Sequence, residues 1–328
     1  MTMKDLIVGF PDQLLEALEI ANNADLKPNQ ERIDNILITG LGGSGIGGKI
    51  VSDITRNECP VPVSLNNDYS IPAFVGKHTL VIVSSYSGNT EETLEAMNKS
   101  LAAGAEVACI TSGGEVQRIA QEKGLNHIVV PGGNPPRACL GYSLVQEFRS
   151  LAHYNMHSID FNASIQKAVA LLKAEDESIK STASDLASYF HNKTPIIYAG
   201  AQHEGVVVRL RQQLNENSKA LCWHHVLPEM NHNELVGWGG GKDEYAVLLF
   251  RSGDDYNRTT VRMDISKEVM SKKAPFKEVT ALGDDSIGRT LYMIYLGDWI
   301  SWYLSELNGV DAIEIDVINH LKGELAKL

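Results

Sequence analysis

Short apolar runs alternate with segments of helical periodicity along most of this chain of 328 residues. After an amphipathic segment at about 3–24, apolar runs at 35–39, 80–84 and 107–110 are each followed by helix-like sequence. Strands that alternate with helices form βαβ units, and such units build a parallel sheet with helices on both faces. The pattern therefore predicts an α/β, doubly wound domain in the first half.

The same alternation restarts after a helical region at 160–190. Further strands and helices are expected at 196–199, 204–213, 245–250, 258–271, 276–280 and 287–307. A chain of this length also exceeds what one hydrophobic core usually holds. We therefore predict two similar α/β domains, 1–155 and 156–328, each with a mostly parallel sheet flanked by helices.

The chain is acidic, with a formal net charge of −12. Binding to a nucleic-acid backbone needs a basic face, and no Lys/Arg cluster is longer than a pair, so nucleic acid is not an expected partner. The same net charge would repel a phosphorylated small molecule. A phosphate site must therefore use local donors such as backbone amides, hydroxyls and single cations.

The N-terminus lacks the features of a secretory signal, and no apolar stretch approaches the ~18 residues of a membrane span. A cytoplasmic protein without membrane contact is expected. Cys59, Cys109, Cys139 and Cys222 are scattered, with no Cys-x-x-C pair. They are expected to be reduced thiols rather than members of a disulfide or a zinc site.

The sequence GLGGSGIGG at 40–48 joins the first predicted strand to a helix. Glycines let the backbone approach an anion, and the helix start offers unpaired N–H groups, so Gly43 and Ser44 are candidate phosphate ligands. Such turns also bind dinucleotides or serve as turns only. The dinucleotide alternative requires an acidic residue at the end of the next strand, and Asp68 comes a little late for that role.

A second turn of this kind, SYSGNTEET, follows the next apolar run. The hydroxyls of Ser85, Ser87 and Thr90 surround a glycine at a helix start and form a cup for an anion without a charged side chain. Helix capping by Asn89 or Thr90 would explain one of these hydroxyls but not all three. Because both turns lie at the carboxyl ends of strands, where open α/β sheets bind ligands, they predict one anion site.

The two turns resemble those of the sugar isomerase (SIS) domain, and the whole chain resembles the bifunctional phosphoglucose/phosphomannose isomerase family. The run PEMNHNE at 228–234 is fairly specific to that family, and similar segments lie at 136–138, 215–217 and 321–322. The resemblance implies two SIS domains and interconversion of glucose 6-phosphate and fructose 6-phosphate. It implies a cis-enediolate path without metal or other cofactor, and a place in glycolysis and gluconeogenesis.

The resemblance also assigns residues to roles. It gives the substrate phosphate to Ser44, Ser85, Ser87 and Thr90. An aldose–ketose shift needs one base to carry a proton between C1 and C2, and a cation to stabilise the oxyanion. The resemblance gives the first role to Glu216, and Arg137 fits the second. Without the resemblance, Glu216 would be interpreted as a solvated residue at a helix end. Arg137 could instead be a surface arginine on a loop.

His232 is expected to move the hydroxyl proton when the sugar ring opens, and in the family this histidine reaches the site of a neighbouring subunit. A homodimer is therefore expected. A structural role for His232 stays open, as does a metal set with His224, His225 and Glu234, although their spacing fits no common pattern. Lys322 resembles a lysine proposed to assist ring opening, or is a solvated charge near the chain end.

One segment departs from the family. Its members often have a stretch with proline and threonine before the last helix, linked with room for the C2 epimer, whereas residues 310–317 are VDAIEIDV. Activity on mannose 6-phosphate is thus less strongly expected than activity on glucose 6-phosphate. Two alternatives stay open: a non-catalytic sugar-phosphate sensor, and an SIS isomerase of another sugar phosphate. A sensor usually carries a DNA-binding module or a basic face, and neither is found.

Overall fold

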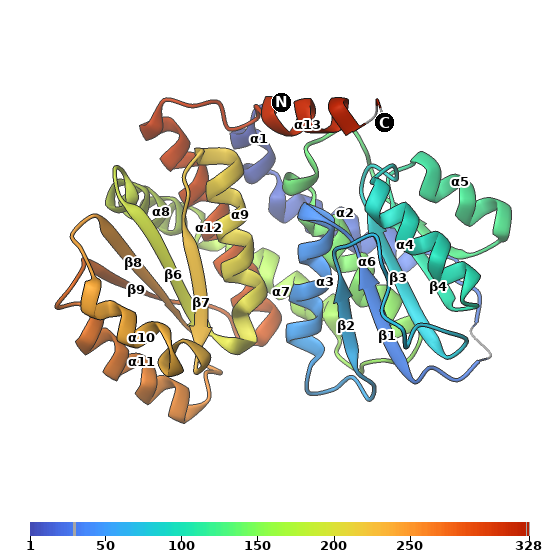
Figure 1. Cartoon of the computed structure of the whole chain (residues 1–328), viewed down its shortest axis with the longest axis horizontal. Coiled ribbons are helices and arrows are strands. Elements are labelled where there is room, and N and C mark those ends of the chain that lie inside the picture. The colour runs from blue at the N-terminus through green and yellow to red at the C-terminus, as the bar shows by residue number, and fades with distance from the viewer. Residues whose placement is uncertain (29–30, 326, 328) are drawn as a thin grey trace.

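Two parallel sheets lie side by side in the computed structural model, which describes residues 1–28, 31–325 and 327 (Figure 1). The first sheet has the strand order β2-β1-β3-β4-β5, and the second has the order β7-β6-β8-β9. All neighbouring strands in both sheets are parallel. The predicted fold class, α/β with two mostly parallel sheets flanked by helices, is confirmed.

The first half holds the five-stranded sheet. Its elements are α1 (Met3–Val8), α2 (Phe10–Asn23), β1 (Asn35–Thr39), α3 (Gly42–Thr55), β2 (Val63–Asn66), β3 (Thr79–Ser85), α4 (Glu91–Ala102), β4 (Glu106–Thr111), α5 (Gly114–Lys123), β5 (Asn126–Val129), η1 (Pro136–Ala138) and α6 (Leu140–His153). The expected opening helix is in fact two, α1 and α2, which meet at Gly9. Pro11, in the first turn of α2, has no N–H to donate and therefore could not continue α1.

The second half holds the four-stranded sheet. Its elements are α7 (Phe161–Ala174), α8 (Asp176–Phe190), β6 (Thr194–Gly200), η2 (Ala201–His203), α9 (Glu204–Ser218), β7 (Trp223–Leu227), η3 (Glu229–His232), α10 (Glu234–Gly237), η4 (Trp238–Gly240), β8 (Tyr245–Arg251), α11 (Asn257–Met270), β9 (Phe276–Thr280), α12 (Ser286–Asn308) and α13 (Asp316–Leu325). Sequence reasoning did not find β5 and β7. Both are short, partly exposed strands at a sheet edge, so neither forms a continuous apolar run.

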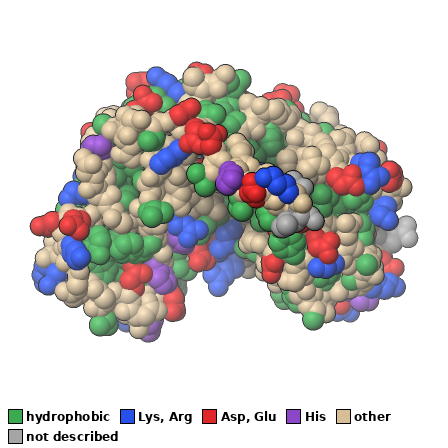
Figure 2. All heavy atoms as spheres, turned by 45° about the horizontal axis from the view of Figure 1, so that its top comes forward, with side chains coloured by type: hydrophobic (Ala, Val, Ile, Leu, Met, Phe, Trp, Pro, Cys, Tyr) green, Lys and Arg blue, Asp and Glu red, His purple; other side chains and the backbone are tan. Residues whose placement is uncertain are grey.

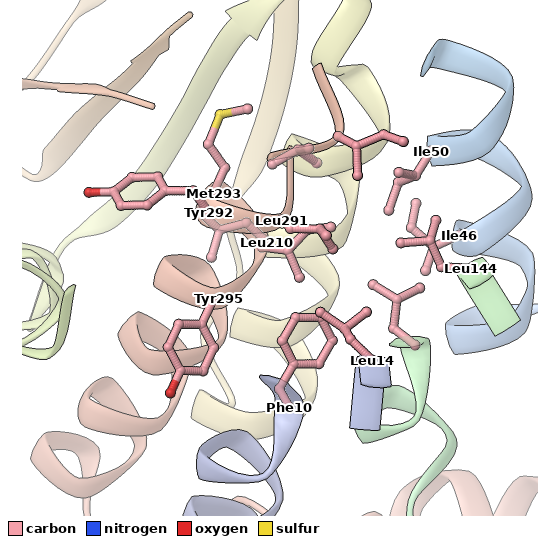
Figure 3. Close-up of a cluster of buried hydrophobic side chains, with 14 of the residues drawn as sticks. Phe10, Leu14, Ile46, Ile50, Leu144, Leu210, Leu291, Tyr292, Met293 and Tyr295 are labelled. Atoms are coloured by element: carbon pink, nitrogen blue, oxygen red, sulfur yellow. The ribbon is translucent and has the colours of Figure 1, made fainter. Parts of the chain in front are cut away.

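One hydrophobic cluster joins the two halves (Figure 3). Helix α12, whose predicted apolar run is buried along most of its length, packs against α7, α8 and α9. The cluster combines side chains of α2, α3, α6, α9 and α12: Phe10, Leu14, Ile46, Ile50, Leu144, Leu210, Leu291 and Tyr295. The domain boundary near residue 155, between α6 and α7, stays a prediction, because this core is continuous across it.

Helices α3 and α9 meet between the sheets and run antiparallel. Gly205, at the start of α9, donates its N–H to Asp53 near the end of α3 over 2.8 Å. At the other end, the start of α3 contacts η1, where Arg137 donates to Asn217 in the last turn of α9. Each helix starts at the carboxyl edge of its own sheet. The two carboxyl edges therefore lie at opposite ends of the molecule.

Candidate active site

The two predicted anion turns lie together at the carboxyl edge of the first sheet, because β1 and β3 are neighbours. The backbone N–H of Tyr86 donates to the Ser44 hydroxyl over 3.0 Å, which ties the second turn to the first. Within the second turn the Ser85 hydroxyl donates to that of Thr90 over 3.3 Å. The structure thus brings the hydroxyls predicted from the sequence into one cluster.

The four hydroxyls differ in access. Ser44 and Ser85 are buried, with 7% and 1% of their surface exposed, whereas Ser87 is exposed and Thr90 is half-buried. Thr90 is the N-cap residue of α4, but its side chain makes no capping hydrogen bond. Helix capping, the structural alternative for Thr90, therefore does not account for its hydroxyl. Ser44 and Ser85 thus lie inside the turns, whereas Ser87 and Thr90 lie nearer to solvent.

Two glycines make the close packing of this edge possible. Gly88 has φ +68°, and a Cβ there would lie 1.8 Å from the carbonyl oxygen of Gly113. A Cβ on Gly43 would lie 2.8 Å from the carbonyl oxygen of Pro136. Gly43 therefore lets the glycine-rich turn approach η1, the element that carries Arg137.

Arg137 is buried, with 3% of its surface exposed, so it is not the surface arginine of the alternative interpretation. Its Nε donates to Oδ1 of Asn217 over 2.7 Å, and its Nη2 donates to the carbonyl of Ala312 over 2.6 Å. Its Nη1 lies 3.4 Å from Oε2 of Glu216. The structure therefore fixes the guanidinium and places the predicted base beside it.

Glu216 lies in the last turn of α9, and 28% of its side chain is exposed. That helix end is anchored rather than freely solvated, because Lys219 caps it with φ +54°. The Lys219 ammonium donates to the carbonyls of Glu216, Asp311 and Glu314, each over 2.7 Å. These bonds also hold the segment that departs from the family, 310–317, against the site.

His232 does not join Glu216 within one chain. It is exposed at the end of η3, which follows the carboxyl end of β7. Glu216 lies at the opposite end of α9 from that edge, and residues 204–216 of the helix span about 18 Å. The two side chains therefore lie at opposite ends of the second sheet.

Lys322 is exposed on α13, a helix in which no described residue is buried. Figure 1 shows α13 lying across one end of the molecule, next to the N-terminus. The loop before it supplies the carbonyls of Ala312 and Ile313 to Arg137. In the space-filling view the two halves form separate lobes with a notch between them, and charged side chains gather beside it (Figure 2).

The chain is similar over nearly its whole length to proteins named bifunctional phosphoglucose/phosphomannose isomerase. It is 35% identical to that of Caldicellulosiruptor bescii, with 99% of each chain covered, and 33% identical to that of Aquifex aeolicus, with 98% of each covered. The chain belongs to the bifunctional phosphoglucose/phosphomannose isomerase family. The family resemblance predicted from the motifs is thus confirmed.

Other similarities agree with this family. Residues 179–325 match the model for the bacterial phospho-glucose isomerase C-terminal SIS domain. A D-glucosamine-6-phosphate 4-epimerase of Sulfolobus acidocaldarius is 31% identical, with 80% of this chain and 82% of that protein covered. The C-terminal domain of glucosamine-fructose-6-phosphate aminotransferase from Francisella tularensis shares the fold, with a TM-score of 0.77 at 16% identity, and covers 95% of this chain and 98% of its own.

Sequence reasoning missed a buried ion pair that supports the site of this bifunctional phosphoglucose/phosphomannose isomerase family member. Nη2 of Arg209 lies 2.7 Å from Oδ2 of Asp298 and also donates to the carbonyl of Arg137 over 3.1 Å. Burial raises the pKa of Asp298, and Arg209 opposes that rise. The available signal was an aspartate within an apolar helix, since a buried carboxylate needs a partner.

Residues of the alternative metal and dinucleotide sites make other interactions. Glu234 accepts hydrogen bonds from the Tyr198 hydroxyl and from Nε1 of Trp223, and burial lowers the pKa of His224 to about 4. In the described part of the chain, no group of three or more His, Cys, Asp or Glu side chains is placed to hold a metal ion. Asp68, the candidate for a dinucleotide ribose, accepts a hydrogen bond from the N–H of Tyr69 in its own turn.

No helix of residues 1–28, 31–325 and 327 is long and apolar enough to cross a membrane.

Proposed function

We propose that this protein is an isomerase that interconverts glucose 6-phosphate and fructose 6-phosphate at the carboxyl edge of its first sheet. The observation that carries the proposal is the pair formed by Glu216 and the buried Arg137, next to a cluster of hydroxyls suited to a phosphate. Family membership supports the same reaction, since relatives at 33–35% identity are named phosphoglucose/phosphomannose isomerases.

In the proposed mechanism the Glu216 carboxylate removes the proton from C2 of the open-chain aldose. The electrons of that C–H bond form the C1–C2 double bond of a cis-enediolate, and Arg137 stabilises the negative oxygen. A proton then moves from the C2 hydroxyl to the C1 oxygen, which places the negative charge on the C2 oxygen. As that oxygen forms the ketone, the electrons of the C1–C2 double bond take the proton back from Glu216 at C1. Gly43, Ser44, Ser85, Ser87 and Thr90 hold the phosphate. The path uses side chains of the protein alone, with neither metal nor cofactor.

Ring opening is assigned to His232 and Lys322. Because His232 lies at the far edge of the second sheet from Glu216, we propose that it enters the site of a neighbouring subunit in a homodimer. Lys322, on α13, follows the loop that contacts Arg137. We further propose that the enzyme works in the cytoplasm, in glycolysis and gluconeogenesis.

A product-resolved assay tests the function. Metal-stripped protein is given fructose 6-phosphate, and glucose 6-phosphate and mannose 6-phosphate are measured separately. Glucose 6-phosphate is expected as the main product, because residues 310–317 line the site without the family's threonine. Glu216→Gln is expected to lower kcat by at least about 10³-fold while fructose 6-phosphate still binds. Full activity in that variant would contradict the assignment of the base.

The same assay separates the alternatives. A protein that binds fructose 6-phosphate without turnover would support the sensor. Because one relative is named an epimerase of D-glucosamine 6-phosphate, that compound is assayed in parallel. Turnover of glucosamine 6-phosphate together with inertness toward fructose 6-phosphate would replace the proposed substrate.

Mixing two inactive variants tests the dimer. In a dimer that combines Glu216→Gln and His232→Gln chains, one of the two sites has an intact Glu216 and an intact His232. Random exchange of subunits is therefore expected to restore about a quarter of the wild-type activity. Activity that stays at the level of the separate variants after proven exchange would show that His232 does not act across subunits.

A further inference from the structure

Glu147, on α6, is a buried carboxyl group with no ion-pair partner. It has 0% of its surface exposed, and in the described structure neither of its carboxyl oxygens has a hydrogen-bond partner. The hydroxyl of Ser84, in β3, is also buried and also lacks a partner there. Buried polar groups in proteins are nearly always paired, since leaving one unpaired destabilises the folded state. A carboxyl group at this position therefore requires an explanation.

The carboxyl lies directly under the helix that starts from the glycine-rich turn. A Cβ on Gly47 of α3 would lie 2.5 Å from Oε2 of Glu147 and 3.1 Å from Oγ of Ser143. Only a residue without a side chain fits between α3 and this group. Helix α6, which carries Glu147, contacts β3, which carries Ser84. The Ser84 hydroxyl opposes the rise in the pKa of Glu147 that burial causes. Burial still raises that pKa well above its ordinary range.

A small cavity lies between Ser84 and the anion turns. It has about 10 Å³ of room for the centre of a water molecule, which is roughly enough for one. Ser44, Ser84, Ser143 and Tyr86 are among the residues that line it. The cavity thus has Ser44, a candidate phosphate ligand, on one side and Ser84, the neighbour of Glu147, on the other.

The hydroxyl of Ser44 has one proton and two lone pairs. One lone pair accepts the N–H of Tyr86 over 3.0 Å. If the second lone pair also accepts a hydrogen bond, the proton of Ser44 is left to point at a ligand. Ser84 can supply this second donor through the cavity only if its single proton is not donated to Glu147. An ionised Glu147 would take that proton, whereas a neutral acid can donate to Ser84 and leave it free.

We propose that Glu147 is a positioning residue for the phosphate site: as a neutral carboxylic acid it donates to Ser84, and Ser84 in turn donates through a water in the cavity to Ser44. The chain of hydrogen bonds aims the Ser44 proton at the substrate phosphate. A neutral acid supplies this donor without placing a negative charge beneath a phosphate dianion. The proposal rests on the proposed function, which gives the phosphate to Ser44.

Binding constants of two substitutions test the proposal. Glu147→Gln keeps a neutral donor, so the Kd for fructose 6-phosphate and for inorganic phosphate is expected to stay within about twofold of the wild type. Glu147→Leu removes the donor and is expected to raise both Kd values and the KM about tenfold, with kcat nearly unchanged, because one hydrogen bond to the chain is lost. Equal Kd values for wild type and Glu147→Leu would overturn the proposal, as would a Glu147→Gln variant that binds as weakly as Glu147→Leu.

Gln146→Leu is the matched control. Gln146 is the adjacent buried polar residue of α6, but it donates to the carbonyl of Ala17 in α2, away from the anion turns. This control is expected to lower stability and leave the Kd for phosphate unchanged. If it weakens phosphate binding as much as Glu147→Leu does, general disturbance of α6 would explain both results and the proposal would fail.

Two further measurements do not depend on the folding of Glu147→Leu. Ser84→Ala alone should weaken phosphate binding to a similar extent. The double variant Ser84→Ala/Glu147→Gln should bind phosphate as weakly as Ser84→Ala alone. Infrared spectra at neutral pH should contain a protonated carboxylic acid band that Glu147→Gln lacks. Absence of this band in the wild type would overturn the proposal. A wild type that binds phosphate without isomerising sugar would instead contradict the proposed function only.

Discussion

The two carboxyl edges of this protein occupy equivalent places in two similar halves, yet they are built from opposite chemistry. At the first edge, the turns after β1 and β3 consist of glycines and uncharged hydroxyls. At the second edge, the turn after β8 carries Asp254 and Asp255, and the turn after β6 carries His203. The two halves share a fold but not the residues at this edge, so function must be argued from the residues of each edge.

The second edge pairs several of its donors with its own carboxylates. Asp254 accepts hydrogen bonds from Nη2 of Arg289 over 2.9 Å and from the Ser252 hydroxyl, and it lies 3.5 Å from Nε2 of His203. Asp255 accepts the N–H of Ser252 over 2.7 Å. The carboxylates of the protein thus take up several donors of this edge, although both ring nitrogens of His203 and Nε of Arg289 have no hydrogen-bond partner in the described structure. The turns after β1 and β3 contain no carboxylate that could take up a donor in this way.

The same substitution at both edges should separate them most strongly. Arg137→Lys is expected to lower kcat about 100-fold, because an ammonium cannot keep the bonds of the guanidinium to Asn217 and Ala312 while facing Glu216. Arg289→Lys should leave kcat within about twofold of the wild type. Steady-state kinetics of both variants, with thermal unfolding as a check of folding, tests this contrast. Equal losses would mean that the second edge also takes part in the reaction.

Adding one methyl group to each edge should have a smaller but still unequal effect. Gly43→Ala would place a Cβ 2.8 Å from the Pro136 carbonyl, so we expect a loss of about 1–3 kcal/mol of stability and about a tenfold drop in kcat/KM. At Gly253 the nearest atom to an added Cβ is Nη1 of Arg289, at 4.0 Å. Gly253→Ala should therefore change neither quantity measurably. Urea unfolding and initial rates measure both, and a silent Gly43→Ala would contradict the tight contact.

Removing hydroxyls from the turns should affect substrate binding at one edge only. Ser87→Ala combined with Thr90→Val is expected to raise KM about tenfold with little change in kcat, because these two hydroxyls are assigned to the phosphate. Ser252→Ala, at the second edge, is the control and should leave KM unchanged. A KM that changes in Ser252→Ala would indicate that the phosphate binds at the second edge, against the proposal.

The smallest effect is expected for Asp254→Asn. Burial alone would raise the pKa of Asp254, but the nearby His203 and the hydrogen bonds from Arg289 and Ser252 hold that pKa well below its ordinary value. A carboxyl with a lowered pKa stabilises the folded state above its unfolded pKa of about 3.9, and this stabilisation is lost as pH falls below that value. Asp254→Asn should thus lower the free energy of unfolding by about 1 kcal/mol at pH 7, since the group is partly solvated.

Urea unfolding of the wild type and Asp254→Asn at several pH values measures this difference. It should shrink as the solution is acidified below pH 4, while isomerase activity at pH 7 stays unchanged. A difference that grows on acidification would contradict the assigned direction of the pKa shift.

The fold was largely predictable because strands buried on both faces are continuous apolar runs. β3 is buried at every position, and its segment was evident in the sequence. β5 and β7 escaped notice because edge strands are covered less and tolerate polar residues such as His127 and His224. The break between α1 and α2 was missed, although Pro11 marks it.

The candidate site was predictable only where its residues lie close together in the sequence. The two anion turns follow from residues close together in the chain, whereas the pairing of Arg137 with Glu216 depends on the packing of η1 against α9 and was expected only from the family resemblance. The pair of Arg209 and Asp298 was missed for the same reason, since each is one charge on an otherwise buried helix face. Local turn chemistry is encoded in short segments, but long-range pairs are set by tertiary packing.

The contacts of Arg137 and Lys219 with residues 311–314 determine when the site can be completed during synthesis. The anion turns and the base belong to the first two thirds of the chain, but the carbonyls that fix the guanidinium come from Ala312 and Ile313. A ribosome must therefore translate the message well beyond the codons for these two residues before these groups leave the exit tunnel. Proteins cut short by a stop codon before residue 312 would contain every assigned residue up to His232 and still lack the carbonyls that position Arg137.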